Sequence, residues 1–539
     1  MNIYTMNTLN KIIHLLPLLL LSCGNVPDYG EPVFGTVKED RPVVETASGA
    51  VSGENRDGVA IFRGIPYGGA CEGEEGRFLP PTDPVSWDGV RDCTANGPIA
   101  VQLGNSISGN QGRLGEHFNG GHPELFGVAD EVQGENCLVL NVLSPGIDNA
   151  KRPVLVYIHG GGFATGSGTL VLGADKFCRE QDIVVVGVNH RLNVFGYLYL
   201  GHLDPGYLTS GNVGLLDLVK ALEWVRDNIA LFGGDPGNVT IMGESGGGMK
   251  VTSLLAMEKA SGLFHKAIIE SGSGAAGTTS KEQAAAQTDR LLAALGIDRS
   301  DWKDLLAVPA GRLRNLSSLA GSGPVGDDIV LSYNPDGNLE LPSFSRNVPI
   351  MVGSSADEMG VFTPVDRIAG ITEETLPAEV QNALNCSPEK AGRIVDVFEK
   401  ENIKGDAPWH TMLKIQSLSG LLGGGAFRQA YAVSGQGGAP VYHYLIEYDS
   451  PSATEEGYDC SWHTADLPLQ FRIVRHPSQE ELSKLYAQCW GAFIRTGNPS
   501  NSMLQWPAFT QDTKQVVVFD NGGTTVKTDP LKNIREAFE

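Results

Sequence analysis

The chain has 539 residues, a formal net charge of −23 and 41% hydrophobic residues. The length would allow two or three domains, but no internal repeat or Pro/Ser-rich linker divides the chain after residue 42, so we expect one large domain with insertions. The negative charge opposes binding to nucleic acids and to anionic lipid surfaces, because both present phosphates that repel an acidic protein. The composition therefore excludes a nucleic-acid-binding protein.

Residues 1–22 are typical of an export signal. A single lysine precedes the apolar run of residues 12–21, which is too short to span a bilayer as a mature helix. The run leads into a Leu-Leu-Ser-Cys sequence that resembles a bacterial lipoprotein cleavage box, with Cys23 as the lipidated residue. Ordinary secretion with cleavage nearby is the alternative. Residues 23–41 would then form a tether, and we expect an exported protein that is secreted or anchored at a bacterial membrane, in the periplasm or on the cell surface.

Residues 153–158 predict a buried strand, which ends in His159-Gly160-Gly161-Gly162-Phe163. Consecutive glycines let backbone N–H groups approach a developing negative charge with no side chain in the way. We therefore assign Gly161, Gly162 and the later Gly246 as the three donors of an oxyanion hole. The second triplet, residues 423–425, has no such context and is expected to be a plain loop.

Residues 239–248 carry the most informative pattern, because a β-branched run leads into Gly243-Glu244-Ser245-Gly246-Gly247 and a helical stretch follows. A strand that turns sharply into a helix lifts the serine onto a strained elbow, where glycines avoid a Cβ clash. A Gly-x-Ser-x-Gly match alone is weak in a chain with 68 glycines. The strand–turn–helix context favours Ser245 as a nucleophile, which then needs a base, an acid that orients the base, and oxyanion donors.

Residues 348–353 predict a further buried strand, and the polar loop that follows contains two adjacent carboxylates, Asp357 and Glu358. Their side chains would point in different directions, so at most one of them faces a histidine. The residues alone do not decide between them.

Four histidines follow this loop, namely His410, His443, His463 and His476. His443 lies inside a strand-like run, which favours a structural role, and His410 and His476 have no supporting pattern. His463 lies in a loop after that strand, where a base can reach back over the sheet, so it is the best candidate of the four.

Together these residues resemble the type-B carboxylesterase/cholinesterase family of α/β-hydrolases. Similar segments cover about residues 43–525 in the family's order, and they are residues 62–67, 135–142, 212–217, 232–236, 263–273 and 496–499. The resemblance implies an α/β-hydrolase fold over residues 42–530. This fold has a large, mostly parallel central sheet flanked by helices, with long loop and helical insertions.

The resemblance also selects Glu358 as the triad acid and His463 as the base, beside Ser245 as the nucleophile. It implies a carboxylesterase that forms an acyl-enzyme, with a small-molecule ester as its partner. We expect a monomer or a homodimer. The sequence contains no His/Cys cluster with metal-ligand spacing and no phosphate-binding glycine-rich loop, so we expect no metal or other cofactor. Among further matched residues, Ser271 would support the triad glutamate with its hydroxyl. Two more, Glu244 and Asp466, would be buried acids that flank the site, although each could equally be a structural hydrogen-bonding group.

The chain departs from the family at two places. The family usually has Ala after the nucleophile, and Gly246 in its place predicts a looser elbow. A disulfide that closes a long loop in the family keeps only Cys137, because Ala100 matches its partner. Cys71 and Cys93 are then candidates for a replacement bridge, which would leave Cys137 free. If Cys23 is lipidated, seven of the eight cysteines remain, and this odd number leaves at least one free thiol.

We expect short- to medium-chain or aryl esters as substrates. A lipase, an amidase or a polyester-type hydrolase would use the same triad, so these remain alternatives. A non-catalytic binding protein on the same scaffold would have lost the nucleophile or the base, and this chain keeps both.

Overall fold

The computed structural model describes residues 41–103, 131–320, 323–364, 367, 370–401, 405, 407–451 and 460–539. The expected export signal and tether, with Cys23, lie outside these described residues. The chain divides into a segment of residues 1–33 and a unit of residues 34–539, and all described residues belong to the second. No helix in the described ranges is long and apolar enough to cross a membrane.

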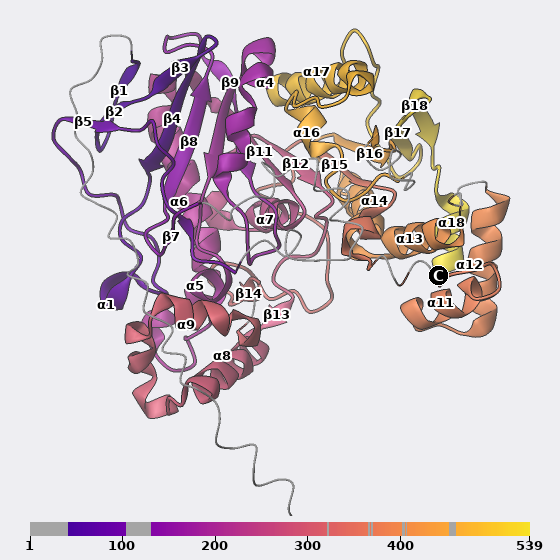
Figure 1. Ribbon diagram of the computed structural model, residues 1–539, viewed down its shortest axis with the longest axis horizontal. Helices are drawn as coiled ribbons and strands as arrows, with labels where there is room; N and C mark the ends of the chain where they lie inside the picture. Colours follow the sequence, from indigo (N-terminus) through magenta and orange to yellow (C-terminus); the bar gives the residue numbers. More distant parts are fainter. Residues whose placement is uncertain are drawn as a thin grey trace, which may run out of the picture. The chain divides into compact units, whose positions relative to one another are not determined.

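An eleven-stranded sheet runs through this unit (Figure 1). The strands from β10 across to β17 are parallel, and antiparallel strands lie at both edges, so the sheet is mostly parallel as predicted. From one edge to the other the strands are β18 (Gly523–Thr528), β17 (Gln515–Asp520), β16 (Val441–Glu447), β15 (Ile350–Ser355), β12 (Lys266–Glu270), β11 (Gly234–Glu244), β9 (Arg152–Ile158), β10 (Val184–Val188), β8 (Val139–Ser144), β4 (Val59–Pro66) and β3 (Glu54–Arg56).

The central strands are apolar on both faces because helices cover both (Figure 1). On β9, Val154 and Val156 pack into one core and Leu155 and Tyr157 into the other. The first core is shared with α6 (Val213–Asn228), α7 (Gly246–Leu255), α11 (Leu376–Leu384), α12 (Pro388–Lys400), α13 (Pro408–Ser419), α14 (Leu421–Ser434) and α18 (Lys532–Phe538), and the second with α4 (Asp175–Gln181), α16 (Leu467–Gln470) and α17 (Glu480–Thr496).

Two further features lie outside the central sheet. A three-stranded sheet contains β1 (Val43–Thr46), β2 (Gly49–Ser52) and β5 (Val90–Asp92). A helical insertion with α8 (Lys281–Leu295) and α9 (Ala310–Asn315) contributes to a separate apolar cluster. The sequence signals for α8 are clear, because the Ser280 and Gln283 side chains form a capping box and Gly296 ends the helix with φ 72°.

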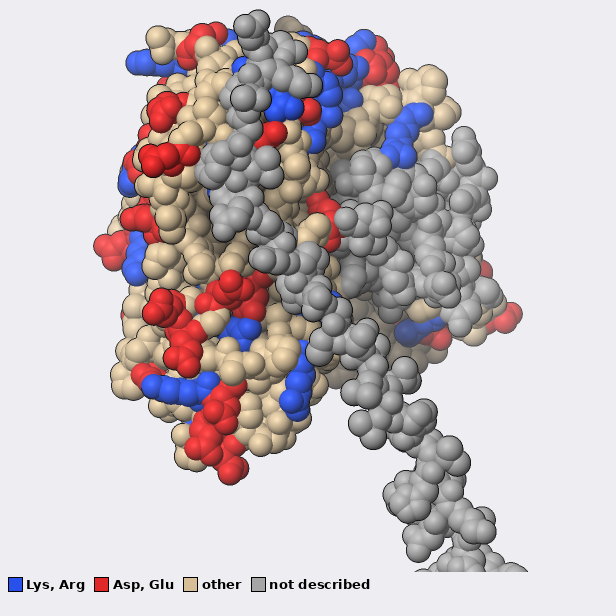
Figure 2. Space-filling view, turned by 60° about the vertical axis from the view of Figure 1, so that its left-hand side comes forward, with Lys and Arg blue, Asp and Glu red and all other residues tan. Residues whose placement is uncertain are grey.

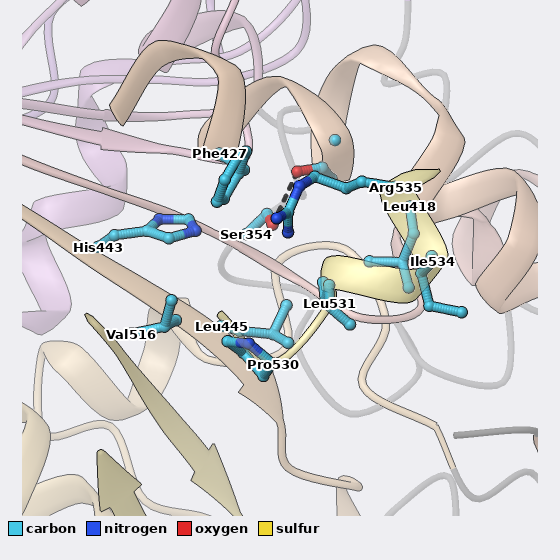
Figure 3. Close-up of a pocket in the computed structure, with 12 residues that line it drawn as sticks. Ser354, Leu418, Phe427, His443, Leu445, Val516, Pro530, Leu531, Ile534 and Arg535 are labelled. Atoms are coloured by element: carbon cyan, nitrogen blue, oxygen red, sulfur yellow. Dashed lines mark hydrogen bonds between the residues drawn. The ribbon is translucent and has the colours of Figure 1, made fainter. Parts of the chain in front are cut away.

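The second glycine triplet, residues 423–425, lies within α14, so the expectation of a plain loop is wrong. A Cβ on Gly425 would lie 2.6 Å from the carbonyl oxygen of Ser273, so these small residues let the helix pack closely against that segment. Beside α14 lies a small, mainly apolar cavity, which Figure 3 shows with Phe427, His443 and Arg535 in its wall. His443 Nδ1 donates to the Val352 carbonyl at 2.9 Å, which fits the structural role predicted for it.

The disulfide expected between Cys71 and Cys93 is not formed, and both residues are buried free thiols. Their positions explain this result. Cys93 follows β5 in the three-stranded sheet, whereas the Cys71 N–H donates to the Asn136 side chain at 2.8 Å and the Cys71 thiol lines a small cavity together with Cys137. Cys137 is a free thiol, as predicted.

A buried ion pair connects the loop after β10 to α6. The Arg191 guanidinium donates to both carboxylate oxygens of Asp217, at 2.8 and 2.6 Å, and the Arg191 backbone N–H donates to the same carboxylate at 3.0 Å. Both side chains are almost inaccessible to water. Removing one partner of such a pair leaves an uncompensated charge in the core.

We therefore expect Asp217→Asn to lower the free energy of unfolding by about 3–5 kcal/mol, because Arg191 would keep a buried charge without its counter-ion. The midpoint of urea unfolding measures this loss. Asp227→Asn is the matched control, since Asp227 pairs with Arg226 at the surface and such pairs contribute about 0–1 kcal/mol. Equal midpoints for the two variants would contradict the expectation.

Candidate active site

Ser245 lies at the junction of β11 and α7, as the sequence predicts, with φ 58° and ψ −126°. The Ser245 N–H donates to the Glu270 carbonyl at 2.8 Å, and the Met249 N–H donates to the Ser245 carbonyl at 3.1 Å. A Cβ on Gly243 would lie 2.4 Å from the backbone of Gly247, so the turn requires glycine there. A non-glycine residue in this conformation costs roughly 1–3 kcal/mol and persists only where neighbouring structure enforces it.

Of the two adjacent carboxylates, Glu358 faces the predicted base. Its carboxylate contacts His463 Nδ1, and both side chains are buried. The second Glu358 oxygen accepts the Ser355 N–H at 2.8 Å. Glu358 lies just after β15, and His463 lies in the loop after β16. The structure thus brings into contact the two residues that the resemblance pairs.

Asp357 points away from His463 toward α13, where His410 Nε2 lies 3.1 Å and Lys414 Nζ 3.3 Å from its carboxylate. Although burial opposes its charge, Lys414 and His410 lower the pKa of Asp357 to about 2. The same carboxylate accepts the Ser461 N–H at 3.0 Å. Asp357 therefore connects the acid loop to the histidine loop. The sequence did not reveal this role for His410, because its partner is 53 positions away along the chain.

The second ring nitrogen of His463, Nε2, lies 3.2 Å from the Glu244 carboxylate. Burial disfavours the imidazolium, but the carboxylates of Glu244 and Glu358 outweigh this effect and raise the pKa of His463 to about 9. Burial also raises the pKa of Glu244 to about 8. Each of the two groups thus binds a proton more strongly than it would in water, although no hydrogen bond joins them among the described residues.

The resemblance also matched Asp466 and Ser271 to the site. Asp466 accepts a hydrogen bond of 2.6 Å from Gln470, and burial raises the pKa of its carboxyl to about 7. The hydroxyl of Ser271, which the resemblance assigns to the triad glutamate, makes no hydrogen bond with Glu358 among the described residues. Instead the Ser355 N–H donates to that carboxylate. Ser271 has a positive φ of 45°, and its N–H donates to the Gly353 carbonyl at 2.9 Å.

The glycine triplet after β9 turns with positive φ at Gly161 and Gly162. Within the described ranges the N–H groups of these two residues donate to no protein oxygen, and the Gly246 N–H is the first of α7 and has no partner within the helix. A Cβ on Gly246 would lie 2.1 Å from the Gly162 carbonyl. Gly246 therefore lets the triplet pack closely against α7, and the looser elbow expected from this glycine stays a prediction.

Lys250, on the helix that follows Ser245, contacts the backbone of the glycine loop. The sequence did not indicate this contact. Lys250 is fully buried on α7, and its Nζ donates to the His159 carbonyl at 3.0 Å. Burial lowers the pKa of its ammonium group to about 7. Thr165 Oγ1 holds the next part of the loop through the Gly161 carbonyl at 3.3 Å. In the described part of the chain no group of three or more His, Cys, Asp and Glu residues is placed to hold a metal ion.

Comparisons with known proteins agree with this geometry. The model of the carboxylesterase family matches residues 40–537. The para-nitrobenzyl esterase of Bacillus subtilis is 32% identical, over 92% of this chain and 98% of its own, and the phenmedipham hydrolase of Pseudarthrobacter oxydans is 29% identical, over 91% and 97%. The crystal structure of a Geobacillus stearothermophilus carboxylesterase superposes with a TM-score of 0.76 at 36% identity, over 92% of this chain and all of the other.

The fold, the elbow and these matches define an enzyme of the α/β-hydrolase class that hydrolyses carboxylic esters. The chain belongs to the carboxylesterase family.

The pKa of His463, which the resemblance assigns as the base, predicts the pH dependence of hydrolysis. A histidine accepts a proton only when it is neutral, so kcat/KM should rise with pH and level off above about pH 9. Glu244→Gln removes a carboxylate that raises this pKa, so the rising limb should move to lower pH. The measurement is kcat/KM for a p-nitrophenyl ester across the neutral and alkaline range, corrected for spontaneous hydrolysis.

Glu223→Gln is the control for this shift, because its carboxylate is at the surface, on α6. A Glu244→Gln profile that coincides with those of the parent and of the control would contradict the electrostatic role given to Glu244.

Proposed function

We propose that the chain hydrolyses esters through an acyl-enzyme, with Ser245 as nucleophile, His463 as base and Glu358 as the acid that orients the base. The contact between His463 Nδ1 and the Glu358 carboxylate supports this proposal most directly. An acid in this position holds the imidazole in one tautomer and stabilises the imidazolium that forms.

In the first half of the reaction the Ser245 hydroxyl attacks the ester carbonyl and His463 Nε2 takes its proton. The N–H groups of Gly161, Gly162 and Gly246 stabilise the oxyanion, and losing one such donor typically costs about 3–4 kcal/mol of transition-state stabilisation. His463 then protonates the leaving alcohol. In the second half His463 activates a water molecule, which releases the carboxylic acid and restores the free serine.

We propose short- to medium-chain or aryl esters as the substrates. The names of similar proteins support this class, since one is a para-nitrobenzyl esterase and another a phenmedipham hydrolase. A similar structure, with a TM-score of 0.75 and 28% identity over 93% of this chain and 98% of its own, belongs to a Clostridium hathewayi esterase that can hydrolyse aliphatic aromatic polyesters.

The test is the initial rate of hydrolysis for p-nitrophenyl esters from acetate to palmitate, with the parent protein and Ser245→Ala. We expect rates that peak at short chains and fall by about 10⁶-fold in Ser245→Ala, since removing a serine nucleophile has an effect of that order. Ser502→Ala, at an exposed serine, is the matched control and should retain the parent rate.

Each alternative has its own signature in this series. A long-chain optimum on emulsified esters would indicate a lipase, and cleavage of matched amides an amidase. Ser245→Ala turnover at the parent rate would refute the assignment of the nucleophile. An intact protein without activity on any ester would revive the non-catalytic alternative.

A further inference from the structure

A cavity of about 500 Å³ borders the backbone that carries Ser245. Its wall includes Phe163, which follows the glycine triplet, and Met249, which lies one turn along α7 from Ser245. It continues along residues 273–279, directly after Gly272, whose Cβ would lie only 2.2 Å from the Ser245 carbonyl. The cavity is therefore lined by residues that follow Gly162 and Ser245 closely along the chain.

The cavity is wide because small residues form much of its wall. In place of large side chains the chain contributes Gly274, Ala275, Ala276, Gly277, Gly323, Gly337 and Gly425. Five of these seven residues are glycines, which add no side chain to the wall, so the space can accept the body of a substrate. Most pockets that bind small molecules have this size, with a few placed polar groups that fix the ligand.

Two polar side chains of the wall, Ser273 and Arg428, make few or no hydrogen bonds with the described part of the protein. The Ser273 hydroxyl is fully buried, yet it has no hydrogen-bond partner in the described part of the chain. Burying a hydroxyl without a partner costs about 1–3 kcal/mol, so such a group usually meets a ligand or water. Ser273 is also one of the residues that line the cavity.

The second group is Arg428 on α14, the one ionisable side chain among the described residues that line the cavity. No ion pair between Arg428 and an acidic residue is found within the described ranges, and its guanidinium makes only a long contact of 3.5 Å with the Gly420 carbonyl. Figure 2 shows Asp and Glu side chains spread over one face of the molecule, in keeping with the net charge of −23. Arg428 is exposed to solvent, and its guanidinium supplies a local positive charge at this cavity of an acidic protein, which attracts negative charge.

We propose that this cavity binds a carboxylate carried by the ester substrate, with the guanidinium of Arg428 and the hydroxyl of Ser273 as its donors. The substrates of this class are half-esters of dicarboxylic acids and esters of hydroxy acids. In both, one ester bond is hydrolysed with one water molecule while the distal carboxylate stays intact. The inference rests on the ester hydrolysis proposed for Ser245.

The test compares kcat/KM for monomethyl adipate and dimethyl adipate, which differ by one negative charge on the acyl side. A second pair, 6-acetoxyhexanoate and its methyl ester, places the same charge on the alcohol side. We expect Arg428→Gln to lower the ratio of anionic to neutral substrate by about 10–100-fold in at least one pair, because hydrogen bonds to charged groups contribute that much. The pair that responds identifies which part of the ester enters the cavity.

Two further variants separate binding of the charge from a structural effect. Arg428→Lys keeps the charge and should restore part of the ratio, and Ser273→Ala should lower it by a smaller factor than Arg428→Gln. Arg290→Gln, at an exposed arginine on α8, is the matched control and should keep the parent ratio.

A parallel loss on both members of each pair, or no change in either ratio, would overturn the carboxylate site. Hydrolysis of p-nitrophenyl butyrate by the same preparations keeps this result separate from the general activity. If the parent cleaves neutral esters but Arg428→Gln leaves both ratios unchanged, only the carboxylate site fails. If the parent cleaves no ester at all, the proposed function fails and the carboxylate site fails with it.

Discussion

The strained backbone of Ser245 is the constraint on which the site depends. A serine at φ 58° and ψ −126° holds this conformation only because β11 is paired on both sides and α7 starts at the next residue. The neighbours of β11 then determine what surrounds the serine. The glycine triplet leaves the end of β9 on one side, and the segment after β12 borders the cavity on the other. The free-energy cost of this backbone strain, about 1–3 kcal/mol, is small compared with the free energy gained by packing the two apolar cores that hold the elbow in place.

Charge is the second organising factor, because the site buries several carboxyl groups close together. Asp357 is paired with the ammonium group of Lys414 and contacts the imidazole of His410, and Glu358 contacts the imidazole that it orients. Glu244 and Asp466 have no such lysine or arginine among the described residues, and burial raises the pKa of both carboxyls. Above these pKa values the carboxylates concentrate negative potential around His463, which favours its imidazolium form. That is the state that the base must reach during attack by the serine.

Local chemistry made much of this site predictable. The elbow at Ser245, the triplet at Gly161 and the loop of His463 each follow a strand whose residues are apolar or β-branched, and such runs are recognisable without a structure. The choice between Asp357 and Glu358 needed the family resemblance, because adjacent side chains leave a loop in opposite directions that sequence spacing does not specify.

The predictions that failed concern packing between distant segments. Residues 423–425 form part of a helix because α14 packs against the segment after β12, a contact between parts of the chain about 150 positions apart. The absence of a bridge between Cys71 and Cys93, and the buried Lys250 below the glycine triplet, have the same origin. The helices and strands can therefore be predicted from local sequence patterns. The residues that pack one helix or strand against another cannot be predicted in this way.

The same contrast distinguishes the residues proposed for catalysis from the residues proposed to set substrate selectivity. The groups proposed for catalysis lie at strand ends, where a short motif suffices to place them. The cavity beside them is bounded by α7, by the segment after β12, and by α14, which come from widely separated parts of the chain. Exposed positions of this wall, such as Arg428 on α14, can change without disturbing the elbow, because they lie outside both apolar cores. An enzyme of this family can therefore acquire a charged contact such as Arg428 while keeping the same triad, and substrate preference is then set by the cavity wall.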